Sequence, residues 1–503
     1  MMPMTLEETA DAVRGVLVPP DGGDAAGGTA GSPIASVVTD SRRVTVGSLF
    51  VAIRGERVDG HDFLPAAAKG GAVAALVDHD VPCDGLARIV VPDTVKALGL
   101  LARAVVDRRR AAAAESPFTV VGITGSVGKT TTKDLLRALL ETMGPTVAPV
   151  GSFNNEIGLP LTVCEVGPDT RFLIAEMGAN HVGEIAGLTR VVPPDIAVVL
   201  KVGVAHLGEF GSVERIAQAK SEIVRGLAPH GTAVLNSGDP RVSAMERLTP
   251  GDVLWFGMED DPAHPGMLVA SDVDVDDADR PSFLMSDGRS SAHVHLGIPG
   301  RHNVANALAA STVAVRLGMG LDRAAEVLSS LTRISPHRMA VGEVSEDGVR
   351  FTVIDDSFNA NPDSVRAGVD GLIRWHAGKS GTDAPRPFRI AVLGAMLELG
   401  DDEEDLHERI GAYAVGAGVD AVIAVGSTTD PHVDALAGAL ARGARAAVES
   451  GRVSVDWVHD AKEADGCIVG LVRGHQESVV LLKGSHFSGL SALAERWSPT
   501  AIG

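Results

Sequence analysis

The sequence predicts an α/β protein of three domains, and three observations support this fold class. The chain has 503 residues, more than one hydrophobic core normally accommodates. Short apolar runs rich in β-branched residues alternate with segments long enough for helices, as in parallel sheets. This alternation occurs in two blocks. We expect a small α/β domain at residues 1–113, a central parallel-sheet domain at 114–334 and a C-terminal Rossmann-like domain at 335–503.

The first domain is predicted to contain a loop rich in Gly, Ala and Pro at residues 19–33. It ends at the segment AAAAESP, after the basic residues 108–110. An apolar run at residues 118–124 (FTVVGIT) then opens the central domain as a buried strand. Further buried strands of this domain are expected at residues 172–177, 196–202 and 232–236.

The last domain is predicted to begin after a helical segment and a turn. Residues 301–317 have helical periodicity, and the turn at residues 334–336 is the expected hinge into the last domain. Buried strands are then expected at residues 351–356, 389–396, 421–426 and 478–484.

Composition and charge restrict the possible partners. Hydrophobic residues make up 45% of the chain and aromatic residues only 3%, so the cores should consist of Val, Leu, Ile and Ala. The net charge of -21 argues against nucleic acid or membrane as a partner, because both are bound by Lys and Arg surfaces. Small phosphate-bearing ligands stay possible, since a local glycine-rich loop, a lysine and a metal hold phosphate regardless of overall charge.

The cellular compartment is predicted from the cysteines and the first residues. Cys83, Cys164 and Cys467 are far apart and lack the spacing of a metal site, which favours a reducing compartment. The opening segment MMPMTLEETADAV is polar and acidic, unlike a signal peptide, and no apolar run is long enough for a membrane span. We expect a cytoplasmic protein.

The strongest motif is a glycine-rich loop, TGSVGKTT at residues 124–131. It lies between the strand expected at 118–124 and a helical run, which is the context of a phosphate-binding loop; the alternative is a chance strand, turn and helix. Ile123 stands where the first glycine of the usual motif is expected. Lys129 would reach the outer phosphates and Thr130 would bind Mg²⁺. The predicted ATP-binding residues of the loop are Gly125, Ser126, Val127, Gly128, Lys129, Thr130 and Thr131.

Two polar residues follow buried strands of the same domain. Glu176 ends the strand FLIAEM, and His206 follows the strand IAVVLKV. Alone, each is more often structural, but ligands of open α/β sheets bind at this edge. A carboxylate here is expected to complete a metal site beside the phosphate loop.

The order of four motifs resembles the Mur ligases over nearly the whole chain. The loop TGSVGKTTTKD resembles that family's ATP loop, and PGRHNVANALAA resembles its adenine-side helix. SFNNEIGLP and EMGANHVGEI resemble two signatures of its central domain. The resemblance implies that SFNNEIGLP contacts substrate through Asn154 and Asn155, and that Asn303 lies near the adenine.

The resemblance also implies a metal centre. Thr130, Glu176 and His206 would surround two Mg²⁺ sites. Lys220 matches the lysine that this family carbamylates with CO₂ to form a metal-bridging carboxylate. Without the family, Lys220 would be interpreted as a solvated helix lysine.

The last domain would supply residues that close on ATP and the incoming amine. Arg338 would neutralise phosphate charge, and Asp356 would hold the ribose or metal. Asn359, Asn361 and Lys483 are the expected substrate contacts of this domain. Without the resemblance, the stretch DDSFNANPDS is equally well explained as an Asx-rich turn.

The first domain looks like a UDP-binding domain. Asp40-Ser41-Arg42-Arg43 precedes the segment GSLFVAIRGERVDGHDF. Ser41 and Arg54 are the expected contacts to uridine or pyrophosphate, although a surface arginine is more often simply solvated.

The subfamily is indicated by NANPDS at residues 359–364, which resembles the enzymes that add D-alanyl-D-alanine. The diaminopimelate-adding relatives carry an Asp-Asn-Pro-Arg motif that is absent from this sequence. One departure is His486-Phe487 after Lys483-Gly484-Ser485, where a basic residue is expected. The contacts of that loop are therefore left open.

The expected activity is ATP-dependent ligation of D-alanyl-D-alanine to UDP-N-acetylmuramoyl-tripeptide in peptidoglycan precursor synthesis. An acyl phosphate would form first, and the amine would then displace phosphate. Lys129, His206, Lys220 and Arg338 are the expected catalytic residues, in a monomer. The alternatives are another Mur-type or folate-type amide ligase, and a nucleotide-switch protein, although the N-K-x-D motif of guanine-specific switches is absent.

Overall fold

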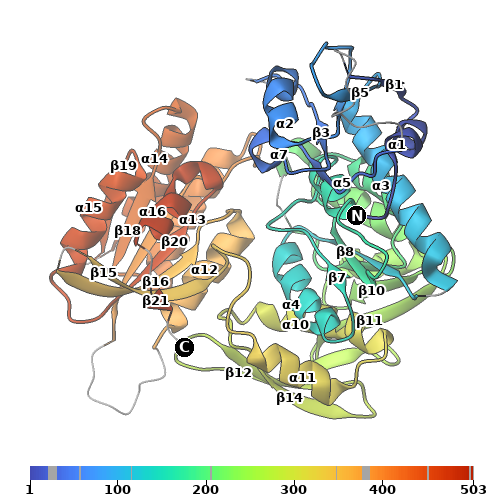
Figure 1. Cartoon of the computed structure of the whole chain (residues 1–503). Helices are drawn as coiled ribbons and strands as arrows, with labels where there is room; N and C mark the ends of the chain where they lie inside the picture. Colours follow the sequence, from blue (N-terminus) through green and yellow to red (C-terminus); the bar gives the residue numbers. More distant parts are fainter. Residues whose placement is uncertain are drawn as a thin grey trace.

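The computed structural model describes residues 1–20, 31–55, 58–114, 116–203, 207–346, 348–376, 386–449, 453–497 and 500–501. Three separate sheets follow one another along the described chain, each accompanied by helices. Figure 1 shows the third α/β unit, in orange and red, beside the other two units. The predicted fold class of three α/β units is confirmed.

The first sheet has the strand order β1-β5-β4-β3-β2, and only β1 is antiparallel to its neighbour. Its strands are β1 (Val16–Val18), β2 (Ser36–Val38), β3 (Ser48–Val51), β4 (Ala74–Val77) and β5 (Ala87–Val90). Its helices are α1 (Leu6–Val13), α2 (Leu64–Gly70) and α3 (Thr94–Ala111). Most of the loop expected at residues 19–33 lies outside the described residues.

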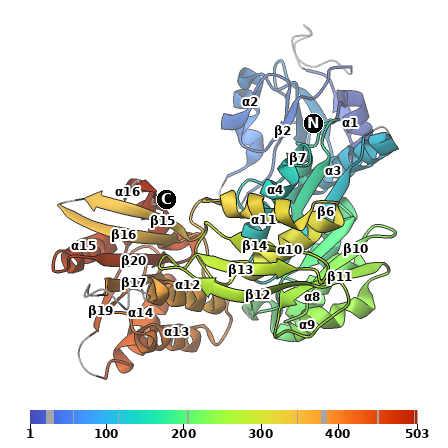
Figure 2. The same cartoon turned by 90° about the horizontal axis from the view of Figure 1, so that it is seen from below.

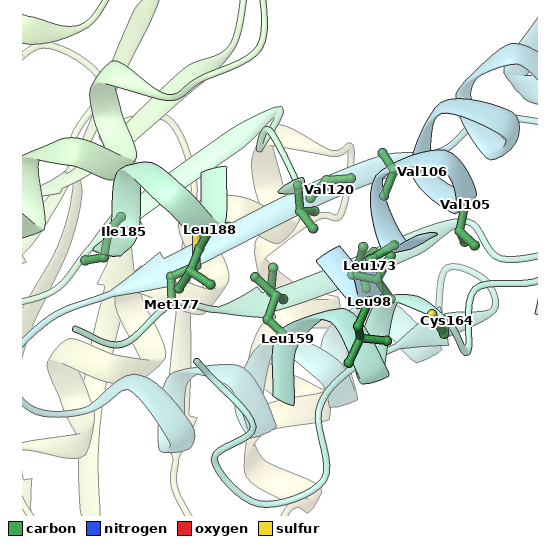
Figure 3. Packing of buried hydrophobic residues seen from close by; sticks show 14 of the residues in the cluster. Leu98, Val105, Val106, Val120, Leu159, Cys164, Leu173, Met177, Ile185 and Leu188 are labelled. Carbon is green, nitrogen blue, oxygen red and sulfur yellow. The ribbon is translucent and has the colours of Figure 1, made fainter. Parts of the chain in front are cut away.

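The long helix α3 joins the first sheet to the central one. Figure 3 shows Leu98 and Val106 of this helix among Val120 and Leu173 of the central sheet. All four side chains are fully buried, in a cluster that also contains residues of the first sheet. The first two units therefore share one apolar core, whereas the third sheet is packed between two clusters of its own.

The central sheet has the order β14-β13-β12-β11-β10-β9-β6-β8-β7. Its parallel strands are β6 (Thr119–Thr124), β7 (Thr146–Val147), β8 (Phe172–Glu176), β9 (Ile196–Val199), β10 (Thr232–Asn236), β11 (Asp252–Met258) and β12 (Leu268–Val275). Its helices are α4 (Lys129–Glu141), α5 (Gly158–Val163), α6 (Glu184–Val191), α7 (Leu207–Phe210), α8 (Val213–Arg225), α9 (Pro240–Ser243), α10 (Asn303–Arg316) and α11 (Leu321–Ser330). The four strands predicted here are confirmed, because each is a fully or mostly buried apolar run.

At its far edge, the central sheet changes from parallel to antiparallel pairing. Strands β13 (Pro281–Ser286) and β14 (Ser291–His295) are antiparallel and extend the parallel part beyond β12. Their side chains alternate between buried and exposed, as expected for strands covered on one face only. Figure 2 shows this edge beside α12 of the third unit.

The third sheet has the order β19-β18-β17-β20-β16-β15-β21. Its strands are β15 (Ala340–Glu346), β16 (Val349–Asp356), β17 (Phe388–Gly394), β18 (Ala421–Val425), β19 (Ser454–Val458), β20 (Ser478–Lys483) and β21 (Thr500–Ala501). Its helices are α12 (Pro362–Arg374), α13 (Glu403–Ala417), α14 (Pro431–Ala446), α15 (Ala461–Val472) and α16 (Leu490–Trp497). The four strands predicted here are confirmed, and β15 is an antiparallel addition.

The central and third sheets bring the functional segments to one cleft. The carboxyl ends of β6 and β8 face those of β16 and β20 across a cleft. Residues 331–339, here called the linker, connect α11 to β15 along this cleft. Among the helices that the structure describes, none combines the length and the apolar character needed to cross a bilayer.

Candidate active site

The phosphate-binding loop has the predicted strand, loop and helix around it. β6 ends at Thr124 and α4 begins at Lys129. Gly128 has a φ of 83°, and a side chain there would lie 2.4 Å from Asn306 Oδ1, so glycine is required at this position. The loop therefore leads into the N-terminus of a 13-residue helix, where backbone N–H groups and the helix dipole favour phosphate.

Lys129 is half-buried at the start of α4. Its Nζ donates a hydrogen bond to the Gly125 carbonyl oxygen at 2.8 Å. Burial lowers the pKa of this ammonium, the charge of Glu176 opposes that change, and the charge of Arg338 reinforces it. A half-buried ammonium that contacts no carboxylate among the described residues can bind the phosphates of a nucleotide.

Glu176 has the features of a metal ligand. Its side chain is fully buried at the end of β8. Oε1 accepts hydrogen bonds from Asn154 Nδ2 at 2.9 Å and from Thr130 Oγ1 at 3.4 Å, whereas Oε2 is buried without a hydrogen-bond partner. A buried carboxylate oxygen without a donor fits a divalent cation, so the residues present fit Mg²⁺.

Lys220 lies on α8 and is buried, not solvated. Its Nζ is 3.4 Å from the Ala179 carbonyl oxygen and 5.6 Å from the centre of the Phe210 ring. Burial lowers the pKa of this amine to about 7, with a further contribution from the charge of Lys129. A neutral amine is the form that reacts with CO₂. The expected fourth member of the metal centre, His206, lies outside the described residues.

The linker brings Arg338 to the phosphate loop. Arg338 Nη2 donates to Thr130 Oγ1 at 3.3 Å, and its guanidinium lies 4.4 Å from the centre of the Phe358 ring. Its Nε is buried without a hydrogen-bond partner. Arg338 therefore keeps donor capacity for an anion between the two sheets.

The third sheet contributes an ion pair at the same cleft. Lys483 at the end of β20 is buried and pairs with the Asp356 carboxylate at 2.7 Å. Its Nζ also donates to the Asn359 carbonyl oxygen at 2.7 Å. Asn361 caps α12, since its Oδ1 accepts a hydrogen bond from the Ser364 N–H at 2.9 Å. These residues hold the strand-to-helix loop in place, and they also line the cavity.

One cavity of about 720 Å³ contains most of the predicted site. This volume is in the range of small-molecule sites. The predicted residues that line it are Ser126, Val127, Gly128, Lys129, Thr130, Thr131, Asn154, Glu176, Asn303, Arg338, Asp356, Asn359, Asn361 and Lys483. Gly125 and Lys220 lie next to the cavity, because they are bonded to the lining residues Lys129 and Ala179. Asn155 directly follows the lining residue Asn154, and its Oδ1 accepts the Gly158 N–H at 2.8 Å.

The nucleotide end of the cavity includes residues that the sequence analysis missed. Asn303 is buried and bonded to Pro299 and Asn306, and the preceding His302 also lines the cavity. Desolvation within the cavity lowers the pKa of His302, and the charge of Asp356 opposes that change. Asp239 lies three positions after β10, and Phe256 lies near the carboxyl end of β11; both line the cavity. The rule that ligands bind at carboxyl strand ends would have found them.

The residues expected to bind UDP lie elsewhere, on the first unit. Ser41 begins a short 3₁₀ helix. Arg54 pairs with Asp78 at 3.0 Å and lies 3.1 Å from His79 Nδ1. Neither Ser41 nor Arg54 lines the cavity between the central and third sheets.

A cluster of His61, Asp78 and His79 has metal-like spacing, and the sequence analysis did not identify it. His61 Nε2 accepts the Asp78 N–H, and Nδ1 is bonded to Asp59 at 2.6 Å. Both ring nitrogens of His61 therefore already have hydrogen-bond partners. The cluster is better described as a hydrogen-bonded polar network than as a metal site.

Comparison with known proteins identifies the family. Family profiles match in order: "Mur ligase family, catalytic domain" at residues 33–106, "Mur ligase middle domain" at 123–314, and "Mur ligase, glutamate ligase domain" at 337–486. A Mycobacterium tuberculosis protein named UDP-N-acetylmuramoyl-tripeptide–D-alanyl-D-alanine ligase is 39% identical over 98% of this chain and 98% of its own length.

Solved structures agree with this match. MurF from Acinetobacter baumannii superposes with a TM-score of 0.81 at 28% identity, covering 99% of both chains. MurF ligase from Thermotoga maritima in complex with ADP gives a TM-score of 0.72 at 29% identity, covering 92% of this chain and 96% of that one. The chain therefore belongs to the Mur ligase family.

Proposed function

We propose that this chain is the ATP-dependent ligase that adds D-alanyl-D-alanine to UDP-N-acetylmuramoyl-tripeptide, giving the pentapeptide precursor, ADP and phosphate. The observation that carries the proposal is one cavity shared by the phosphate loop, by Glu176 with its unpartnered oxygen, and by Arg338 and Lys483 from the opposite side. The names of the full-length relatives supply the substrate class.

ATP would lie across this cavity. Residues 125–131 would surround its phosphates, Asn303 would be near the adenine, and Asp356 would contact the ribose or a metal. Thr130, Glu176, His206 and carbamylated Lys220 would hold two Mg²⁺ ions. When bound, Mg²⁺ supplies positive charge that neutralises the phosphate oxygens.

The first step forms a bond between the tripeptide carboxylate and the γ-phosphorus of ATP and breaks the bond to ADP. The product is an acyl phosphate, which an amine can attack, whereas a free carboxylate is inert. Lys129 and Arg338 would stabilise charge on the transferring phosphoryl group.

The second step joins the amine of D-alanyl-D-alanine to the activated carbonyl. The amine loses a proton, and phosphate leaves from the tetrahedral intermediate. Asn154 and Asn155 would contact the tripeptide, and Asn359, Asn361 and Lys483 would position the dipeptide. Closure of the third unit would exclude the water that hydrolyses acyl phosphate.

The remaining assignments extend this proposal. Ser41 and Arg54 would contact uridine or pyrophosphate on the first unit. We place the domain boundaries near residues 113 and 334. We expect a cytoplasmic protein, because ATP and UDP-linked precursors are cytoplasmic. We also expect it to act as a monomer.

The test is phosphate release from MgATP with UDP-N-acetylmuramoyl-tripeptide, measured with and without D-alanyl-D-alanine. We expect release only with both substrates, and a product mass increased by one dipeptide less one water. Release that does not depend on an amine would instead support a nucleotide switch. Turnover with a different amino acid would assign another ligation step.

A further inference from the structure

Lys133 is a buried cation that the proposed reaction does not use. It lies on α4 four residues after Lys129, and only 2% of its side chain is exposed. Its Nζ donates to the carbonyl oxygens of Pro149 at 3.0 Å and Gly151 at 3.2 Å, and it pairs with Asp134 at 2.8 Å. Lysine is rarely buried without such partners, so these contacts fix the ammonium in one position.

The same two side chains hold the linker. The Ser335 N–H donates to Asp134 Oδ2 at 2.9 Å, and Lys133 Nζ donates to Ser335 Oγ at 3.4 Å. The Asp134 side chain is 14% exposed, so water competes weakly for these bonds. The helix that follows the phosphate loop is thereby joined to the connection between the central and third units.

This contact restricts Arg338. Arg338 follows Ser335 by three positions, so even a fully extended chain places them at most about 11 Å apart. The linker therefore touches α4 twice, at Asp134 through Ser335 and at Thr130 through Arg338.

The linker backbone between these two contacts and just beyond is constrained. His337 has a φ of 59° and Met339 a φ of 52°. A left-handed conformation costs a non-glycine residue about 1 kcal/mol or more, and it persists only where surrounding contacts impose it.

The other end of the network reaches the metal ligand. Gly151, which accepts from Lys133, lies three residues before Asn154. Asn154 Nδ2 donates to Glu176 Oε1 at 2.9 Å, and its carbonyl oxygen accepts the Gly178 N–H at 2.9 Å. Lys133 is therefore bonded to residues 149–151 and to Ser335, and the segments that contain these residues also line the cavity.

We propose that Lys133 and Asp134 form a positioning pair that places Arg338 and Asn154 around the nucleotide together. The pair does not contact the reacting atoms, and it acts through the linker and through residues 149–154. This inference rests on the proposed function in assigning Arg338 to the transferring phosphoryl group.

The first test compares two variants with a matched control on the same helix. Lys133→Met removes the ammonium at similar length, and Asp134→Ala removes the acceptor for Ser335. Arg137→Ala removes an exposed cation that pairs with Glu141 at 2.7 Å. We expect kcat to fall about 30- to 100-fold in the first two variants, as for displaced catalytic groups. The KM for ATP and the Kd for ADP should stay within about threefold, and Arg137→Ala should resemble the parent.

A double variant shows whether the pair acts through Arg338. Asp134→Ala in an Arg338→Ala background should lower kcat by less than about threefold further, because Asp134 holds the linker through Ser335 and the arginine that the linker carries is already absent. A full additional loss would overturn the proposal. An equal loss of ADP affinity would overturn it too, since that pattern indicates a general disruption of the phosphate loop.

A readout independent of catalysis separates this inference from the proposed function. Arg333 is an exposed trypsin site in the linker. Lys133→Met and Asp134→Ala should be cleaved there faster than the parent or Arg137→Ala. Faster cleavage in a chain that forms no pentapeptide would support the linker contact while rejecting the function. Unchanged cleavage in both variants would overturn the inference, and Asp134→Ala alone carries these tests if Lys133→Met does not fold.

Discussion

The lysines on the two walls of the cavity differ in their bonding partners. On the central wall, Lys129 and Lys220 donate to backbone carbonyl oxygens, and neither forms an ion pair with any residue that the structure describes. On the opposite wall, Lys483 is paired with Asp356 at 2.7 Å. Burial lowers the pKa of all three ammonium groups, but only Lys483 has a contacting carboxylate to compensate.

This difference indicates what each wall does. A desolvated charge without a contacting carboxylate is unfavourable, so Lys129 favours an anion bound at the central wall. Glu176 has the complementary property, because one of its oxygens has no donor. Lys129 therefore favours a bound phosphate, and Glu176 favours a bound metal ion. On the opposite wall, the charges of Lys483 and Asp356 already offset each other, and this pair orients the loop before α12.

The largest expected effect is on the central wall. Lys129→Met should lower kcat about 10³-fold, as expected when a group that stabilises developing charge is removed. The free energy of unfolding should not decrease, because the ammonium that is removed has no carboxylate partner. Phosphate release and chemical denaturation measure the two quantities. A destabilised variant would mean that Lys129 is structural, like Lys483.

The opposite wall should show the reverse order of effects. Lys483→Met leaves the Asp356 carboxylate unpaired, so the free energy of unfolding should fall by about 3 kcal/mol. Adding Asp356→Asn should restore part of that loss, because the unpaired charge is removed. Denaturant unfolding of the two variants measures this. If the parent and Lys483→Met have the same free energy of unfolding, the Lys483–Asp356 pair does not stabilise the fold, and the two walls do not differ in this respect.

The sequence predicted the parts of the site that depend on local order. A strand, a glycine-rich loop and a helix are adjacent in the chain, so the phosphate loop and Lys129 could be identified from residue order alone. Glu176 followed from its place at a strand end. The fold class followed from the alternation of apolar runs.

What the sequence did not predict depends on contacts between distant segments. Physical interpretation of Lys220 favoured a solvated helix lysine, and only the family resemblance indicated otherwise, because its burial depends on the packing of α8. The bond from Ser335 to Asp134 joins residues 201 positions apart. Strand β13 was missed because a short alternating segment resembles a polar loop.

An intermediate effect concerns the pH dependence of Lys220. With its pKa lowered to about 7, the amine is charged below that pH and neutral above it. Carbamate should therefore increase as pH rises through about 7, and the reactive neutral fraction should fall about tenfold per pH unit below it. Carbon NMR with ¹³C-labelled CO₂ at constant dissolved concentration would show the signal. Its persistence in Lys220→Met would assign the carbamate to another amine.

The smallest effect tests whether the opposite wall only orients. Asn361 caps α12 through Ser364. Asn361→Ala should lower the free energy of unfolding by about 1 kcal/mol, the usual effect of losing an N-terminal cap, whereas Asn361→Asp keeps an acceptor and should retain most of the stability. If Asn361 also contacts the dipeptide, both variants raise the KM for D-alanyl-D-alanine while the KM for ATP is unchanged. Asn361→Asp keeps the capping oxygen but lacks the amide. If the KM for D-alanyl-D-alanine rises only in Asn361→Ala, together with the loss of stability, Asn361 has a structural role alone.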